Sequence, residues 1–328
     1  MSDIALPFDV LTIGRVGIDL YPLQSNVTLD KVETFKKSIG GSPTNVAIAA
    51  AKHGLRAAVI TRTGMDLFGQ FIKDELIRLG VSDEFVSGVK DLNTPVVFAE
   101  IFPPDDFPLY YYREPIAPDL MIDPKELDLD AIKQAKIYWS TLTGLSEEPS
   151  RSAHYAGWNA RDTAALTVLD LDYRPTLWDS PAAASAQISK VLERVSIVIG
   201  NLEECKLATS ESDPDRVANA LIDKGAEIAV VKMGPKGVLA KSRNETVVKL
   251  PHSIKVLNGL GAGDSFGGAF CYGLLEGWDL DRVITFANMA GAINASRSDC
   301  STAMPSTHEV ESALALNMKV ISKTIQRK

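Results

Sequence analysis

Gly261-Ala262-Gly263-Asp264, which Gly259 precedes and Phe266 follows, is the stretch of this sequence that decides the prediction of its fold and chemistry. Its small residues end a loop where an apolar helical pattern begins, so backbone N–H groups and the positive end of a helix dipole should converge there. Such a point binds anions. Asp264 is also favoured in a first helical turn for local reasons, but here it could take a proton from a nucleophile beside the anion. The stretch alone does not decide whether Asp264 serves the helix terminus or accepts a proton. A second motif that binds the nucleophile is needed to decide.

Length and composition limit the class of protein. The chain has 328 residues, 45% of them hydrophobic and 23% charged, which is enough to bury a large core in one α/β domain. A net charge of −8 argues against nucleic-acid binding, because any phosphate has to be held by a few local cations and N–H groups. No run approaches the ~18 apolar residues of a membrane span, and the N-terminus shows no secretory pattern. Three widely spaced cysteines suit a reducing compartment, so we expect a cytoplasmic protein without a membrane partner.

Short apolar runs rich in β-branched residues alternate with amphipathic helical patterns along the chain. The runs that predict strands cover residues 10–16, 57–62, 136–141, 166–171, 196–201 and 227–232. This alternation is typical of an α/β fold with a mainly parallel central sheet and helices on both of its faces. Ligands of such folds bind at the carboxyl ends of the strands.

Two places break this alternation and predict a small β lid. Residues 94–102 and 109–113 form two strand patterns joined by a proline-rich turn, and residues 18–23 continue the first strand past a glycine. We interpret residues 1–328 as a single domain, with the lid inserted from about 17–37 and 92–115. Because the edges of an exposed lid are unpaired, a homodimer formed through the lid is a reasonable expectation.

The second glycine motif is Gly40-Gly41-Ser42-Pro43-Thr44-Asn45, followed by an alanine-rich helical pattern. Ser42 and Pro43 fit the start of a helix by local rules. The two glycines do not follow from capping, and they would let a ligand approach the backbone. Asn45 in the first turn offers donors and an acceptor to a hydroxyl group. A glycine turn before a packing helix is the alternative if this segment is taken alone.

With both glycine motifs present, the sequence resembles the ribokinase-like (PfkB-type) carbohydrate kinases from end to end. The resemblance implies that a glycine pair, a following Asn and an Asp after the first strand hold the sugar. The residues at these positions are Asp19, Gly40, Gly41 and Asn45. It also implies that Asp264 is the catalytic base for attack by a primary hydroxyl on the γ-phosphorus of ATP. The N–H groups of Gly261, Ala262 and Gly263 would stabilise the transferring phosphoryl group.

The resemblance extends to the nucleotide side. Residues 201–204 fit an Asn-x-x-Glu element that positions magnesium and phosphate, and residues 232–237 resemble the nucleotide loop. The residues assigned to the nucleotide are Asn201, Lys232, Gly234, Gly237, Gly261, Gly263 and Asn288. ATP and Mg²⁺ are the implied cofactors, and Glu204 would reach the metal through water. From the residues alone, Asn201 and Glu204 could equally cap a helix, Lys232 could form a surface ion pair, and Asn288 could serve helix packing.

Two arginines favour an acidic substrate. Arg113 follows three tyrosines on the lid and Arg174 follows the strand at 166–171, and Arg can bind a carboxylate through two hydrogen bonds. Tyr111 and Tyr112 are the tyrosines nearest Arg113, and of these we assign Tyr112 to the substrate, with Tyr111 as the alternative. The alternatives are that Arg113 pairs with Glu114 or another lid acid and that Arg174 contacts an ATP phosphate.

Within the family, these segments are most similar to kinases of keto-deoxy sugar acids. By this resemblance, residues 14–22, 103–109, 113–114 and 172–175 together favour 5-dehydro-2-deoxygluconate of inositol breakdown as the substrate and its 6-phosphate as the product. The alternative substrates are 2-dehydro-3-deoxygluconate, fructose and ribose, and a sugar-binding regulatory protein is the alternative without catalysis. Asn258-Gly259 stands where the family usually has Asp-Thr, which removes a carboxylate that supports a monovalent cation. A requirement for such a cation is therefore left open.

Overall fold

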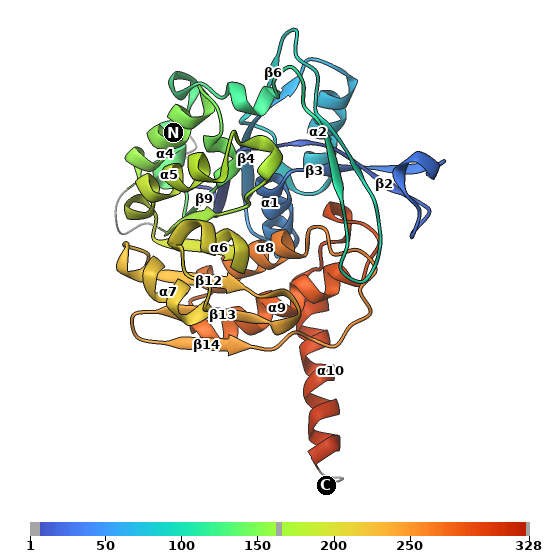
Figure 1. Cartoon of the computed structure of the whole chain (residues 1–328), viewed down its shortest axis with the longest axis vertical. Coiled ribbons are helices and arrows are strands. Elements are labelled where there is room, and N and C mark those ends of the chain that lie inside the picture. The colour runs from blue at the N-terminus through green and yellow to red at the C-terminus, as the bar shows by residue number, and fades with distance from the viewer. Residues whose placement is uncertain (1–6, 162–165, 326–328) are drawn as a thin grey trace, which may run out of the picture.

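A ten-stranded sheet forms the centre of the structure (Figure 1). The computed structural model describes residues 7–161 and 166–325, with 317–325 described by their backbone alone. The spatial order is β14 (Thr246–Lys249), β13 (Val238–Ser242), β12 (Ile228–Lys232), β11 (Ile197–Asn201), β10 (Leu166–Asp170), β9 (Ile137–Thr141), β1 (Val10–Ile13), β4 (Ala57–Gly64) and β5 (Val81–Ser82), and β6 (Val86–Val89) also pairs with β4. Only β12–β13 and β13–β14 pair antiparallel among these strands, so the prediction of a mainly parallel sheet is confirmed.

Helices cover both faces of the sheet because successive strand residues point to opposite sides. Val10 of β1 belongs to one hydrophobic cluster and Leu11, the next residue, belongs to the other. The first cluster is covered by α1 (Ser42–Lys52), α2 (Leu67–Arg78), α8 (Ala262–Leu275), α9 (Leu280–Ala295) and α10 (Thr307–Ile325). The second is covered by α3 (Leu129–Gln134), α4 (Ser150–Ala160), α5 (Pro181–Val191), α6 (Leu202–Thr209) and α7 (Pro214–Asp223). No helix within the described ranges has the length and apolar character needed to cross a membrane.

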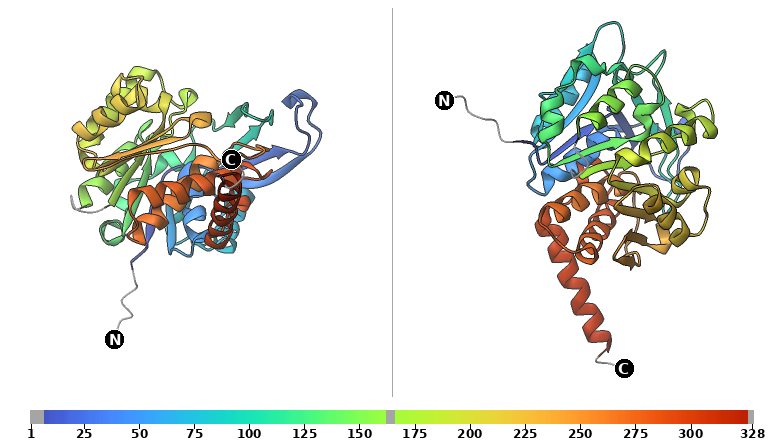
Figure 2. Two further views of the ribbon diagram at one scale, coloured as in Figure 1. Left: turned by 90° about the horizontal axis from the view of Figure 1, so that it is seen from below. Right: turned by 90° about the vertical axis from the view of Figure 1, so that its left-hand side faces the viewer.

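A separate four-stranded sheet forms the predicted lid and projects from the body of the molecule (Figure 2). Its order is β3 (Phe35–Gly40), β2 (Gly17–Pro22), β7 (Val96–Ala99) and β8 (Leu109–Tyr112). Two distant segments of the chain therefore build it, as the sequence predicts. Residues 18–23 do not extend β1 within the central sheet, because β2 pairs with β3 and β7 instead.

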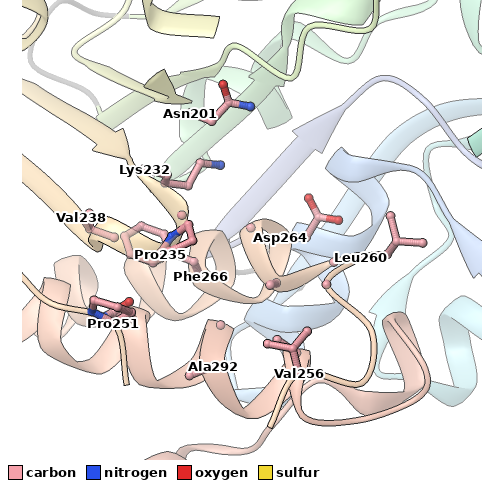
Figure 3. Close-up of a pocket in the computed structure, with 18 of the residues that line it drawn as sticks. Asn201, Lys232, Pro235, Val238, Pro251, Val256, Leu260, Asp264, Phe266 and Ala292 are labelled. Carbon is pink, nitrogen blue, oxygen red and sulfur yellow. The ribbon is translucent and has the colours of Figure 1, made fainter. Parts of the chain in front are cut away.

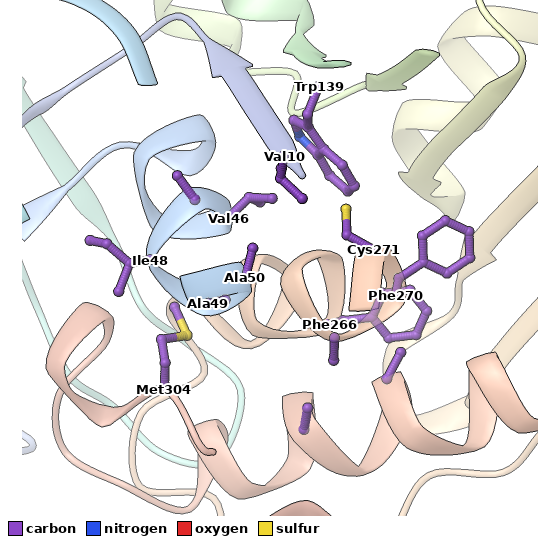
Figure 4. Close-up of a cluster of buried hydrophobic side chains, with 14 of the residues drawn as sticks. Val10, Val46, Ile48, Ala49, Ala50, Trp139, Phe266, Phe270, Cys271 and Met304 are labelled. Carbon is purple, nitrogen blue, oxygen red and sulfur yellow. The ribbon is translucent and has the colours of Figure 1, made fainter. Parts of the chain in front are cut away.

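Helices α1 and α8 pack with almost no side chain between them (Figure 4). A Cβ atom added at Gly268 would lie 2.3 Å from the Ala49 Cβ and 2.5 Å from the Ala50 nitrogen. A Cβ added at Gly267 would lie 2.9 Å from the Trp139 ring. The glycines of α8 and the alanine run of α1 are therefore matched, and together they let the two helix backbones approach closely.

We expect Gly268→Ala to destabilise the fold although alanine is the better helix former. Helix propensity alone would favour the exchange by about 1 kcal/mol, whereas overpacking against Ala49 and Ala50 costs about 1–3 kcal/mol. Urea unfolding followed by circular dichroism measures the change in midpoint. The reverse exchange Ala186→Gly, on the exposed face of α5, calibrates the propensity contribution. A Gly268→Ala protein that unfolds at higher urea than the wild type would contradict the contact described here.

Candidate active site

Two cavities meet at Asp264. The outer cavity, of about 740 Å³, lies over the carboxyl ends of β10, β11 and β12 and the first turn of α8 (Figure 3). The inner cavity, of about 50 Å³, lies between the end of β1, the start of α1 and the lid. The residues that line both cavities are Ser42, Arg174, Leu260, Gly261 and Asp264. A group transferred from one cavity to the other would pass these residues.

Asp264 is held by the first turn of α1. Its two carboxylate oxygens accept hydrogen bonds from the Ser42 hydroxyl at 2.7 Å and from the Asn45 amide at 2.9 Å. Burial and the neighbouring Asp172 carboxylate raise the pKa of Asp264, and these two hydrogen bonds oppose the rise because they favour the charged form. Gly261 caps α8 with a φ of 77°. The N-termini of two helices thus converge on one half-buried carboxylate.

The inner cavity is lined by groups that bind hydroxyls. The Asp19 carboxylate accepts a hydrogen bond from the Tyr21 hydroxyl at 2.9 Å, and burial raises the pKa of Asp19 to about 6. The Oδ1 atom of Asn45 is buried without a partner among the described residues. A Cβ at Gly40 would lie 2.2 Å from the Asp19 carboxyl group, and Gly41 has a φ of 106° that favours glycine. The glycine pair therefore makes room for Asp19 and turns the backbone toward α1.

The outer cavity contains every residue that the sequence assigns to the nucleotide. These are Asn201, Lys232, Gly234, Gly237, Gly261, Gly263 and Asn288, and Glu204 lines the cavity as well. Asn201 and Glu204 also form a capping box at the start of α6, with bonds of 2.9 and 2.7 Å. Asn201 and Glu204 therefore do cap α6, as the alternative interpretation expected, and both also line the outer cavity. The side chain of Asn288 donates to the Leu250 carbonyl at 2.9 Å.

Lys232 lies among acidic groups opposite the start of α8. Its Nζ atom is 4.0 Å from Asp170 Oδ1, and a Cβ at Gly263 would lie 3.2 Å from the same Nζ. Burial alone would lower the pKa of Lys232, but the carboxylates of Asp170 and Glu204 outweigh it and the pKa is raised. Burial raises the pKa of Asp170 to about 7 and also raises that of Glu204. The surface ion pair considered for Lys232 is thus a largely buried one.

Two of the residues predicted to contact substrate lie elsewhere. Tyr112 is 62% exposed and packs edge-on against Phe98 on the outer face of the lid. Arg113 forms an ion pair of 2.8 Å with the buried Asp119, and it does not line either cavity. Tyr112 points outward because successive residues of a strand face opposite sides of the sheet, so Tyr111 faces inward and its two neighbours face outward.

Sequence reasoning gave no individual role to four groups at the site, although most of them lie in segments that carry the resemblance. Arg15 lines the inner cavity, Asp170 and Asp172 line the outer one, and residues 104–105 at the tip of the β7–β8 hairpin also line the outer one. Asp170 ends β10 and Arg15 follows β1, so the rule that ligands bind at the carboxyl ends of strands could have found them. Within the described residues, no group of three or more His, Cys, Asp or Glu side chains is arranged to hold a metal ion.

Comparison with known proteins gives the same fold and one family. Residues 8–307 match the model of the pfkB family carbohydrate kinases. A 5-dehydro-2-deoxygluconokinase of Listeria monocytogenes is 33% identical over 94% of this chain and 96% of its own. The 5-dehydro-2-deoxygluconokinase of Bacillus subtilis is 34% identical over 93% and 95%. A crystal structure titled putative ribokinase II from E. coli, in complex with ATP and Mg²⁺, superposes with a TM-score of 0.86 at 21% identity, covering 94% of this chain and 99% of the other.

The family match spans most of the chain, and the two relatives align over nearly their whole length. The chain therefore belongs to the pfkB family of carbohydrate kinases.

Proposed function

We propose that this protein transfers the γ-phosphoryl group of ATP to the terminal hydroxyl of 5-dehydro-2-deoxygluconate, forming the 6-phosphate in the breakdown of myo-inositol. The observation that carries the proposal is the position of Asp264, a half-buried carboxylate at the junction of the two cavities. The relatives named 5-dehydro-2-deoxygluconokinase support the choice of substrate. Because ATP is supplied in the cytoplasm, we place the reaction there.

In this reaction Asp264 accepts the proton of the attacking hydroxyl. As the sugar oxygen bonds to the γ-phosphorus, the bond from phosphorus to the bridging oxygen breaks and ADP leaves. The N–H groups of residues 261–263, at the N-cap and start of α8, have no partner within the helix, and that of Ala262 makes only a long bond of 3.4 Å to the Gly259 carbonyl. In the proposed reaction they stabilise the charge on the moving phosphoryl group. Lys232 faces the same turn and adds a positive charge.

The remaining residues divide between the two cavities. Asp19, Asn45 and the backbone at residues 40–41 bind the hydroxyls of the sugar, and Arg174 binds its carboxylate. Asn201, Gly234, Gly237 and Asn288 contact the nucleotide. We do not assign Tyr112 or Arg113 to the substrate, since neither lines a cavity.

The donor set at the outer cavity fits magnesium bound mainly through phosphate and water. The side chains of Asn201 and Glu204 already accept backbone hydrogen bonds in the capping box, so Glu204 would reach the metal through a water molecule. Magnesium, when bound with ATP, neutralises charge on the β- and γ-phosphates. Glu204 and Asp170 supply the nearby carboxyl groups.

The lid has to open for the sugar to enter. The inner cavity of about 50 Å³ is far smaller than the ~300–1,000 Å³ of usual ligand sites. Its lid wall is formed by Val97 of β7 and Leu109 of β8, along with Asp19 and Tyr21 of β2. We propose that the chain acts as a single kinase domain in which the lid, inserted at about 17–37 and 92–115, moves as a unit.

We also propose that two copies pair through the outer face of the lid. A row of edge-packed aromatic rings crosses this face, from Phe35 through Phe98 to Tyr112. Tyr110 and Tyr112 are 42% and 62% exposed there. Exposed aromatic rings on a sheet face favour burial against a partner, and a second copy of this chain presents the same rings.

Replacing Asp264 by Asn tests the role of the base. We expect kcat to fall by about 10²–10⁴-fold, because proton acceptance is lost while size and polarity are kept. The affinity for ATP, measured by calorimetry, should stay within about threefold of the wild type. Asp215→Asn removes an exposed carboxylate on α7 and serves as the control. Near-normal turnover by the Asp264→Asn enzyme would refute the assignment.

A panel of acceptors tests the substrate. ADP release should be measured with 5-dehydro-2-deoxygluconate, 2-dehydro-3-deoxygluconate, fructose and ribose at matched concentrations. We expect the highest kcat/KM with the first acid, and at least about tenfold lower values with the neutral sugars, because they leave a cation without a partner. A neutral sugar that is turned over faster than both acids would overturn the proposed substrate class.

Light scattering tests the lid interface. The wild type should have twice the chain mass of 35.4 kDa, and Tyr112→Lys should shift the protein toward the single-chain mass. Val248→Lys places the same charge at a residue of β14 that is 57% exposed, and it should leave the mass unchanged. A wild type that is monomeric at high concentration would rule the interface out.

A further inference from the structure

Two guanidinium groups face the inner cavity. Arg174 follows β10 and is the arginine already assigned to the substrate, whereas Arg15 follows β1 and has no role in the function proposed above. Both line the cavity together with Asp264 and the hydroxyl-binding groups Asp19 and Asn45. Arg15 is only 7% exposed. A buried cation on the wall of a small polar cavity requires an explanation, because its transfer from water is costly.

One carboxylate is shared between the two cations. Arg15 Nη2 lies 3.4 Å from Asp172 Oδ2, and Arg174 Nη2 lies 2.6 Å from Asp172 Oδ1. Among the described residues, neither arginine forms an ion pair with any other carboxylate. The oxygens of Asp264 are bound by Ser42 and Asn45 instead. Two positively charged guanidinium groups therefore share a single carboxylate, that of Asp172, as their ion-pair partner.

Hydrogen-bond donors are also left over at this point. The Nε atoms of Arg15 and Arg174 are buried and have no partner among the described residues, and the same holds for the Tyr111 hydroxyl. The ring of Tyr111 lies 5.6 Å from the Arg15 guanidinium carbon, so its hydroxyl belongs to the same cluster. Buried donors nearly always find a partner in the functional state of a protein. An anionic group with several lone pairs would accept hydrogen bonds from these free donors and pair with both guanidinium groups.

We propose that Arg15 binds the carboxylate of the substrate directly, beside Arg174, and that it determines the preference of the enzyme for a sugar acid over a neutral sugar. The inference rests on the proposed function and adds a residue to its acid-binding site. Asp172 holds the two guanidinium groups side by side, and Tyr111 covers Arg15 from the lid. Because Tyr111 lies on β8 and Arg15 follows β1, closure of the lid completes the site around the carboxylate.

The experiment is a double-mutant cycle that includes the substrate. The kcat/KM of Arg15→Met, Arg174→Met and the double variant is measured with 5-dehydro-2-deoxygluconate and with its carboxamide, which has the same shape without the charge. Each single variant should lower the acid-to-amide ratio by about 10–100-fold, mainly through KM, because a charge-assisted hydrogen bond is lost. The double variant should lower the ratio further than Arg174→Met alone.

A positioning role gives a different result. If Arg15 acted only by orienting Arg174, its replacement in the Arg174→Met background would leave the ratio unchanged within about twofold, and the inference would be overturned. Arg62→Met is the matched control, since this buried arginine pairs with Glu126 outside both cavities and should keep the wild-type ratio. The thermal midpoint of each variant verifies that it is folded. If Arg15→Met does not fold, Arg15→Gln takes its place and should lower the acid-to-amide ratio in the same way.

The two hypotheses fail separately. A wild type that phosphorylates no sugar acid but accepts a neutral sugar contradicts the proposed function before any variant is made. A wild type that prefers the acid, combined with an Arg15→Met enzyme whose acid-to-amide ratio is unchanged, leaves the proposed function standing and contradicts the role of Arg15.

Discussion

The close contact between α1 and α8 is the constraint on which the site depends. Ser42 and Asp264 are 222 residues apart in the chain and 2.7 Å apart in space. A hydrogen bond of that length between two helix N-termini needs helix axes that approach closely, which Gly268 permits by leaving room for Ala49 and Ala50. A bulkier residue at the crossing would separate the carboxylate from the first turn of α1. The close packing of α1 against α8 therefore also sets the position of the Asp264 carboxylate.

The charges around Lys232 show why the phosphoryl donor of the proposed reaction has to arrive with a divalent cation. Four carboxyl groups raise the pKa of this lysine: Asp170, Glu204, Asp264 and Asp172. Burial and the neighbouring carboxylates raise the pKa of Asp170 to about 7, so a further negative charge beside this cluster is unfavourable. A polyphosphate brings more negative charge to the same place. Lys232 alone cannot balance both, and a magnesium ion bound with the nucleotide would neutralise the remainder.

The sequence predicted the fold and the two glycine-led helix starts of the site because these follow from local patterns. Glycines before helices drew attention to residues 40–45 and 261–264 from local pattern alone, whereas Asn201 and Lys232 were assigned through the resemblance to the family. The acid-binding groups depend on tertiary contacts that local patterns do not encode. Which of the alternating tyrosines faces inward depends on the pairing of Tyr111 with Val97, and the partner of Arg15 is 157 residues away. Arg113 carries the same side chain, but a buried acid six residues later binds it.

The lid connects enclosure of the sugar with completion of the anion site. The hairpin between β7 and β8 reaches down so that Phe107 packs against Gly259, where a Cβ would lie 2.7 Å from the ring. Gly259 begins the loop that leads into α8. If the lid opens to admit the sugar, Phe107 leaves this loop and the N–H groups at residues 261–263 lose a support. Closure over the sugar restores the support and excludes water from Asp264 in one movement. Under the proposed function, the phosphoryl group is thus transferred when the sugar hydroxyl, and not water, faces the base.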